Sequence, residues 1–221
     1  MAALVIFDCD GVLVDSEPLF ARVLGETLIA ADFPTTIDEA LTLGFGKNRA
    51  TLLAAVETRF GRALPDDFFD MIRARATLLF EQELLPMAGV VELLAMLPGP
   101  RCVASNSHLE RVQHSLAVTG LLPLFDPHVF SASQIAHGKP APDLFQFAAR
   151  RFRARPEECI VVEDSTAGVE AAIAAGMPVV GFCGGSHCRG GHADWLLAAG
   201  CSRVFARMSD LGSFLCADPC A

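Results

Sequence analysis

Residues 3–17 read ALVIFDCDGVLVDSE, an apolar run that ends abruptly at two closely spaced aspartates. Ala3–Phe7 has the length and the β-branched content that are typical of a buried strand. Asp8 and Asp10 follow where such a strand ends, and Gly11 is a turn residue. Ligands of open α/β sheets bind beyond the carboxyl ends of the strands. The segment therefore predicts a first strand with a candidate site directly after it.

Further short apolar runs predict strands later in the chain: Cys102–Ala104, Val129–Phe130, Cys159–Val162, Val179–Phe182 and Val204–Phe205. Helical spacing of apolar residues lies between the later runs, at Val90–Leu97, Ser107–Thr119, Asp143–Phe152 and Ala167–Ala175. Ser107 and Glu110 have the spacing of a capping box at the start of one of these helices. Strands that alternate with helices predict an α/β fold, a doubly wound parallel sheet covered on both faces.

The stretch from Glu17 to Leu84 breaks this alternation. It contains no convincing strand and predicts several helices, at Pro18–Ala30, Thr36–Leu43, Asn48–Phe60 and Pro65–Leu84. We therefore expect a small helical domain at residues 17–84, inserted after the first strand. Residues 1–16 and 85–221 would then form the α/β core.

The composition excludes some classes of protein. With 17 Lys and Arg against 26 Asp and Glu, the formal charge is −9, which argues against a nucleic-acid binder. No secretory signal and no apolar stretch of membrane-spanning length is visible, so no membrane association is expected. The eight cysteines are scattered, and several lie in or beside strand-like runs, which favours a reduced cytoplasmic protein. No obligate protein partner is inferred.

Asp8 and Asp10 are two residues apart and point in similar directions if the strand geometry continues. Repulsion between two such carboxylates is relieved when a cation lies between them, and Mg²⁺ prefers oxygen ligands. The alternative is a simple acidic turn at Gly11. The pair alone does not decide between these interpretations.

Three further segments place polar residues after predicted strands or before helices. Ser105-Asn106-Ser107 follows the second strand, and its hydroxyl and N–H groups could bind a phosphoryl oxygen. Residues 138–145, GKPAPDLF, put Lys139 on a proline-stiffened loop, and Glu163-Asp164 ends the most apolar strand. Each has an ordinary explanation alone, as a helix cap, a turn or a solvated charge.

Together, DCDGVLVDSE (8–17), SNS (105–107), GKPAPDLF (138–145) and VVEDSTAG (161–168) resemble the haloacid dehalogenase superfamily. The resemblance is to its phosphatase and phosphomutase branch with a helical cap, and it spans nearly the whole chain. The dehalogenases of this superfamily lack the second aspartate of the first motif. Asp10 therefore favours phosphoryl chemistry over carbon–halogen cleavage.

The resemblance implies a two-step reaction. Asp8 would attack phosphorus and form an aspartyl-phosphate, and Asp10 would act as the general acid and base. Mg²⁺ would be held by the carboxylates of Asp8 and Asp164 and by the backbone carbonyl of Asp10.

The resemblance also assigns the binding residues. Ser105 and Lys139, with Asn106 as an additional contact, would bind the phosphoryl group, and Glu163 would orient Lys139 or a metal-bound water. The helical insert would cover the site, and its candidate substrate contacts are Gly46, Lys47, Asn48 and Arg49.

The function that follows is a Mg²⁺-dependent phosphatase of small phosphorylated metabolites. Sugar phosphates, or phosphorylated sugar acids such as 6-phosphogluconate, are the implied substrates. A phosphomutase of the β-phosphoglucomutase type shares the same catalytic residues and is the alternative. A non-catalytic descendant would lack a catalytic carboxylate or the lysine, and none of these is missing.

The segment from Cys183 to Cys201 also contains His187, Cys188 and His192. Its spacing lacks the paired C-x-x-C elements of a structural zinc site, and it is rich in glycine. We expect a surface loop near the edge of the active site.

Overall fold

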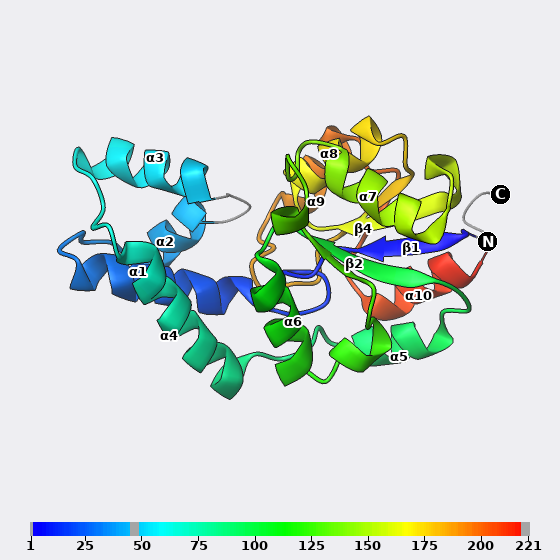
Figure 1. The fold of residues 1–221 in the computed structure, drawn as a ribbon, viewed down its shortest axis with the longest axis horizontal. Coiled ribbons are helices and arrows are strands. Elements are labelled where there is room, and N and C mark those ends of the chain that lie inside the picture. The colour runs from blue at the N-terminus through cyan, green and yellow to red at the C-terminus, as the bar shows by residue number, and fades with distance from the viewer. Residues whose placement is uncertain (1, 45–48, 218–221) are drawn as a thin grey trace. The chain divides into compact units, whose positions relative to one another are not determined.

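The computed structural model describes residues 2–44 and 49–217. The chain forms two compact units: Met1–Asp15 with Leu85–Ala221, and Ser16–Leu84. Figure 1 labels most of their helices and several of the strands.

A six-stranded parallel sheet forms the centre of the larger unit, in the order β3-β2-β1-β4-β5-β6. The strands are β1 (Leu4–Phe7), β2 (Arg101–Ser105), β3 (Val129–Ser131), β4 (Cys159–Glu163), β5 (Val179–Phe182) and β6 (Val204–Phe205). The predicted α/β fold with a parallel sheet is confirmed. The strand that precedes Asp8 is central, since Phe7 pairs with Val103 on one side and Val162 on the other.

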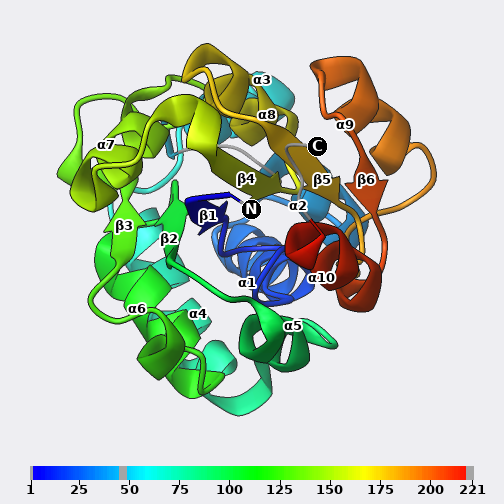
Figure 2. The ribbon, with the colours of Figure 1, turned by 90° about the vertical axis from the view of Figure 1, so that its right-hand side faces the viewer.

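Helices cover both faces of this sheet. Figure 2 shows α7 and α8 on one side and α5, α6 and α10 on the other. The helices of this unit are α5 (Val90–Met96), α6 (Leu109–Val118), α7 (Asp143–Phe152), α8 (Thr166–Ala174), α9 (His192–Ala199) and α10 (Met208–Cys216). Because strand side chains alternate between faces, Leu4 and Ile6 join the apolar cluster that includes Phe145, while the ring of Phe7 lies against Phe125. Short 3₁₀ segments lie at Leu122–Leu124, Ala132–Gln134 and Pro156–Glu158.

The start of α6 differs from the prediction. Its N-cap residue is His108, which makes no side-chain capping bond, so the predicted capping box of Ser107 and Glu110 is wrong. The Ser107 hydroxyl instead donates a 2.7 Å hydrogen bond to the carboxylate of Asp10. The Ser107 hydroxyl therefore bonds to a distant charged carboxylate and not to a backbone N–H of α6.

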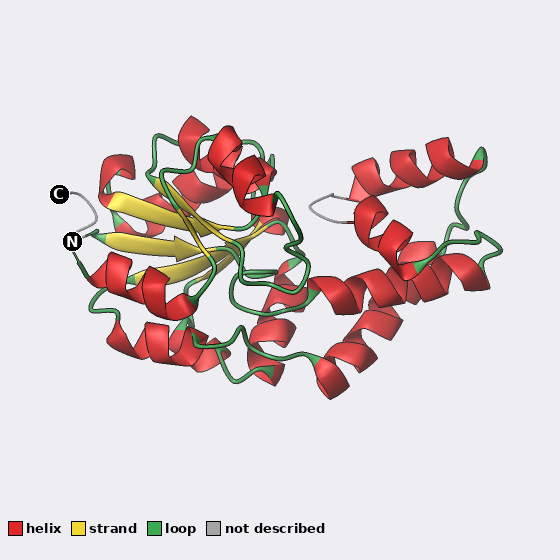
Figure 3. Cartoon of the chain, turned by 180° about the vertical axis from the view of Figure 1, so that it is seen from behind, coloured by secondary structure: helices red, strands yellow, loops and turns green. Residues whose placement is uncertain are grey.

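The described part of the smaller unit consists of helices joined by loops (Figure 3). It contains α1 (Glu17–Ala30), α2 (Ile37–Gly44), α3 (Arg49–Phe60) and α4 (Phe68–Glu83). A separate apolar cluster, which includes Leu24, Val56 and Phe68, holds these helices together. Thr36 and Glu39 form a capping box before α2, because each side chain accepts a hydrogen bond from the other's backbone N–H.

No described helix is both long enough and apolar enough to cross a membrane. The cysteines within the described residues carry free thiols.

Candidate active site

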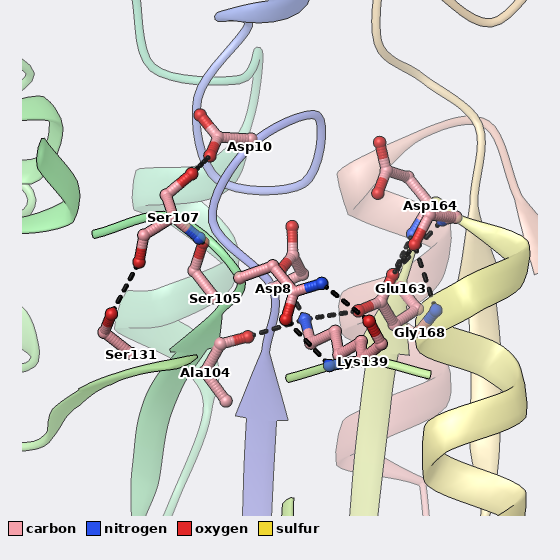
Figure 4. A network of polar contacts seen from close by, with 12 residues as sticks. Asp8, Asp10, Ala104, Ser105, Ser107, Ser131, Lys139, Glu163, Asp164 and Gly168 are labelled. Carbon is pink, nitrogen blue, oxygen red and sulfur yellow. Dashed lines mark hydrogen bonds and ion pairs between the residues drawn. The ribbon is translucent and has the colours of Figure 1, made fainter. Parts of the chain in front are cut away.

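The candidate site lies at the carboxyl edge of the central strands. Asp8 follows β1, while Ser105 and Glu163 are the last residues of β2 and β4. Parallel pairing of these three neighbouring strands brings their carboxyl ends together. Lys139 reaches the same place from the loop before α7, as Figure 4 shows.

Lys139 is the central cation of the site and is only 5% exposed. Its ammonium donates to the Asp8 carboxylate at 2.5 Å, to the Glu163 carboxylate at 2.6 Å and to the Ala104 carbonyl at 2.7 Å. Burial lowers the pKa of Lys139, but Asp8 and Glu163 more than offset this effect and hold that pKa above its ordinary value. The ammonium therefore remains charged, with all three of its N–H donors used.

Three buried carboxylates, those of Asp8, Glu163 and Asp164, have oxygen atoms within 4.8 Å of one another. Burial raises the pKa of Asp8 well above its ordinary value; Lys139 lowers it in part, and Glu163 and Asp164 raise it further. Burial and the charge of Glu163 likewise raise the pKa of Asp164. One ammonium cannot neutralise three carboxylates. An all-oxygen donor set with excess negative charge fits a hard divalent cation such as Mg²⁺.

Glu163 is completely buried and uses both of its oxygens. One accepts from Lys139, and the other accepts from the backbone N–H of Asp164 and from the backbone and hydroxyl of Ser165. Gly168 makes room for it, since a Cβ there would lie 1.9 Å from the Glu163 carboxyl carbon. This carboxylate is thus fixed as a partner for Lys139.

Asp10 is turned away from this cluster (Figure 4). Its carboxylate accepts hydrogen bonds from Ser107 Oγ at 2.7 Å and from the Arg111 guanidinium at 2.8 Å. Sequence reasoning did not assign Arg111. Arg111 lies in the first turn of α6 and Ser107 lies just before the N-cap residue, so no helical spacing links the two residues in the sequence.

The segment after β2 supports the lysine loop. The Asn106 amide donates to the Lys139 backbone carbonyl at 3.0 Å and accepts from the Lys139 backbone N–H at 2.8 Å. Ser105 is buried, and its hydroxyl accepts from the backbone N–H of Ser107. The structure therefore brings Ser105 and Lys139 to Asp8, and it places the Asn106 side chain on the backbone of Lys139.

The expected contacts of the helical insert are not placed. Gly46, Lys47 and Asn48 lie outside the described residues. Arg49 is the first residue of α3, and its side chain also lies outside the described part of the chain.

The segment after β5 also reaches the site. His187 and His192 are each 6% exposed, so the expectation of a surface loop is wrong for both histidines. The nitrogen Nε2 of His187 lies 3.0 Å from the carboxylate of Asp164, and Nε2 of His192 lies 2.7 Å from its backbone carbonyl. The high glycine content around these histidines is typical of an exposed loop, so the sequence alone did not indicate that they are buried.

Three comparisons place this geometry among known proteins. The 6-phosphogluconate phosphatase of Escherichia coli (strain K12) is 34% identical over 186 residues, which are 83% of either chain. The fructose-1-phosphate phosphatase of the same organism is 32% identical over 180 residues, 80% of this chain and 94% of the relative. The crystal structure of a conserved haloacid dehalogenase-like protein of unknown function from Agrobacterium tumefaciens str. C58 superposes with a TM-score of 0.87. It is 38% identical and covers 98% of this chain and 99% of that chain.

Residues 2–176 match the family described as haloacid dehalogenase-like hydrolases, which is most of the chain. The two curated relatives share more than 30% of their residues with it over most of their length, and both are phosphatases. The chain therefore belongs to the haloacid dehalogenase-like hydrolase family.

Proposed function

We propose that this enzyme is a Mg²⁺-dependent phosphatase of small phosphorylated sugars or sugar acids, and that it works through an aspartyl-phosphate on Asp8. The observation that carries the proposal is the Lys139 ammonium, which joins the carboxylates of Asp8 and Glu163 beside Asp164. A buried nucleophile beside a fixed cation and an acidic metal site suits the transfer of an anionic phosphoryl group.

The carboxylates of Asp8 and Asp164 and the backbone carbonyl of Asp10 would hold Mg²⁺. When bound, the ion supplies positive charge that orients the phosphoryl group and offsets its charge in the transition state. Gly11 keeps this region open, because a Cβ there would lie 1.9 Å from a carboxylate oxygen of Asp164.

In the first step, an Asp8 carboxylate oxygen forms a bond to phosphorus while the bond from phosphorus to the sugar oxygen breaks. Asp10 gives its proton to that leaving oxygen. In the second step, a water oxygen attacks phosphorus and the Asp8–phosphorus bond breaks. Asp10 takes up the proton that the water loses, so the enzyme returns to its starting state.

Lys139 would stabilise the negative charge on the phosphoryl oxygens during both steps, and Ser105 would bind the same group. Glu163 would keep Lys139 in place through its 2.6 Å contact. The Asn106 side chain already holds the backbone of Lys139, so we assign its phosphate contact to the Asn106 backbone N–H.

Proton delivery requires a movement of Asp10. Its carboxylate accepts hydrogen bonds from Ser107 and Arg111. Before it can protonate the leaving oxygen, Asp10 would have to turn away from these donors. Ser107 and Arg111 would thus hold the Asp10 carboxylate away from the leaving oxygen until substrate is bound.

The relatives support the substrate class, since 6-phosphogluconate and fructose 1-phosphate are both small sugar phosphates. We propose that residues 17–84 form a cap that selects among such substrates. The proposed contacts are Gly46, Lys47 and Asn48, which precede α3 in the sequence, and Arg49, its first residue.

The test is a phosphate-release assay over a panel of phosphorylated sugars and sugar acids, with and without Mg²⁺. We expect Mg²⁺-dependent release by the wild type and none by Asp8→Asn, whose amide oxygen still accepts from Lys139. Full activity of Asp8→Asn, or activity that does not depend on Mg²⁺, would contradict the proposal. Isomerised sugar phosphate in place of free phosphate would identify a phosphomutase.

A further inference from the structure

Two buried histidines contact Asp164 at different atoms. His187 Nε2 lies 3.0 Å from the carboxylate oxygen Oδ2, and His192 Nε2 lies 2.7 Å from the backbone carbonyl oxygen. One bond therefore fixes the side chain of Asp164, and the other fixes its backbone.

Simple chemistry sets the direction of these hydrogen bonds. A carbonyl oxygen only accepts, so His192 must carry a proton on Nε2. An ionised carboxylate also only accepts, so His187 donates from Nε2 when Asp164 is charged. A neutral imidazole can make either donation.

The His187 ring is itself held in place. A Cβ at Gly11 would lie 2.8 Å from its Cε1 atom, and a Cβ at Gly185 would lie 2.7 Å from the same atom. These two glycines allow the backbone to pack against the imidazole. The loop is also tied to the first motif, because the Asp15 carboxylate accepts from both the backbone N–H and the hydroxyl of Ser186.

We propose that His187 and His192 are positioning residues that hold Asp164 in the orientation that binds the divalent cation. The inference rests on the proposed function, in which Asp164 is a metal ligand. A carboxylate whose second oxygen is already hydrogen-bonded loses less rotational freedom when it binds a metal. Removal of such a partner typically weakens metal affinity by about 10–100-fold.

A transition-metal site is the competing explanation. Cys188 Sγ lies 3.1 Å from His187 Nε2, and His187, Cys188 and His192 have ligand atoms within 4.8 Å of one another. However, Nε2 of each histidine lies within hydrogen-bond distance of an oxygen of Asp164, so a soft metal bound through these two nitrogens would displace both hydrogen bonds. The contacts therefore favour positioning.

The experiment measures the binding of Mn²⁺, a paramagnetic substitute for Mg²⁺, to the metal-free full-length chain by electron paramagnetic resonance. We expect His187→Ala to weaken Mn²⁺ binding by about 10–100-fold. His187→Gln should restore most of the affinity, because its amide nitrogen can donate from the position of Nε2. His192→Gln should likewise bind more tightly than His192→Ala. Cys183 is a half-buried residue of the same segment, so Cys183→Ser is the control and should bind Mn²⁺ with the affinity of the wild type.

Activity provides a second readout. For His187→Ala, the Mg²⁺ concentration that gives half-maximal rate should rise by the same factor, while kcat at saturating Mg²⁺ stays near that of the wild type. A loss that persists at saturating Mg²⁺ would indicate general damage and would overturn the proposal.

Unchanged Mn²⁺ affinity in His187→Ala would overturn the inference and leave the proposed function standing. An equal loss in His187→Ala and His187→Gln would also overturn it. Loss of Zn²⁺ binding with unchanged Mn²⁺ binding would assign these residues to a soft-metal site instead. If the wild type bound no Mn²⁺, the metal role of Asp164 in the proposed function would fail together with the inference.

Discussion

Replacement of Lys139 by Met removes the ammonium and keeps a side chain of similar length. The change deletes hydrogen bonds to Asp8, Glu163 and the Ala104 carbonyl. Lys139 is 5% exposed and Glu163 is completely buried, so water cannot easily replace the lost donor. The variant would keep the buried carboxylates and lose the positive charge that accompanies them.

Removal of one partner from a buried ion pair typically costs about 3–5 kcal/mol of stability. For a unit of this size, about 2–4 °C of melting temperature corresponds to each kcal/mol, so we expect a fall of about 6–20 °C in the metal-free protein at neutral pH. Loss of one electrostatic donor at the reacting group should also lower kcat by at least about 100-fold.

Urea unfolding of the metal-free protein measures the stability. Trp195 is the single tryptophan of the chain and lies on α9, so its fluorescence reports on the α/β unit. The loss should shrink at pH 5 relative to pH 7, because protonation of the carboxylates removes the uncompensated charge. Arg155→Met, which breaks only surface ion pairs with Glu157 and Glu158, is the control and should change little. Wild-type stability of Lys139→Met at pH 7 would refute the view that this ammonium stabilises the buried carboxylates of Asp8 and Glu163.

Three further predictions follow from the same site. The raised pKa values of Asp8 and Asp164 mean that the folded metal-free protein holds protons that the unfolded chain releases above about pH 4. Its free energy of unfolding should therefore fall as pH rises through the folded pKa values, and in thermal melts Mg²⁺ should stabilise it more above those pKa values than below them. A Mg²⁺ effect independent of pH would contradict this. Asp10→Asn should give a rapid burst of nitrophenol from p-nitrophenyl phosphate, whose leaving group needs no proton, followed by slow turnover as aspartyl-phosphate accumulates. Stopped-flow absorbance measures the burst, and its absence would argue against Asp10 as the base of the second step. Gly168→Ala places a Cβ 1.9 Å from the Glu163 carboxyl carbon. It should lower the free energy of unfolding, measured in urea, by about 1–3 kcal/mol, and it should also lower the activity. Gly190→Ala, where an added Cβ meets nothing within 4 Å and the backbone is not in the left-handed region, should leave stability and activity unchanged.

The sheet could be predicted because each buried strand is a short apolar run bounded by turn residues. The helices α9 and α10 could not be predicted from the sequence. Gly212 lies inside α10, where glycine has a low helix propensity, and it is tolerated because the helix packs closely on Met96 and Leu93. That compensation comes from residues more than a hundred positions away and leaves no local signal.

The site likewise contains residues that could be predicted from the sequence and contacts that could not. Asp8, Ser105 and Glu163 could be found because each stands at the end of a strand, where parallel pairing gathers them. The Arg111–Asp10 contact joins residues 101 positions apart, and the Ser186–Asp15 contact joins residues 171 positions apart. Such contacts depend on the packing of loops and helices around the sheet, which no local pattern of residues encodes.

Charge links these observations. Asp8, Glu163 and Asp164 are buried together, and the Lys139 ammonium contacts the carboxylates of Asp8 and Glu163. Without a further cation the site can relieve its repulsion only by taking up protons, and a protonated Asp8 is a poor nucleophile. A divalent ion would restore the ionised form of Asp8 and remove the repulsion between the carboxylates. Metal affinity, stability at neutral pH and the reactivity of Asp8 should therefore change together when any one of these charges is altered. His187 contacts the carboxylate of Asp164, and its replacement should change the metal affinity and leave the chemistry of Asp8 intact at saturating Mg²⁺.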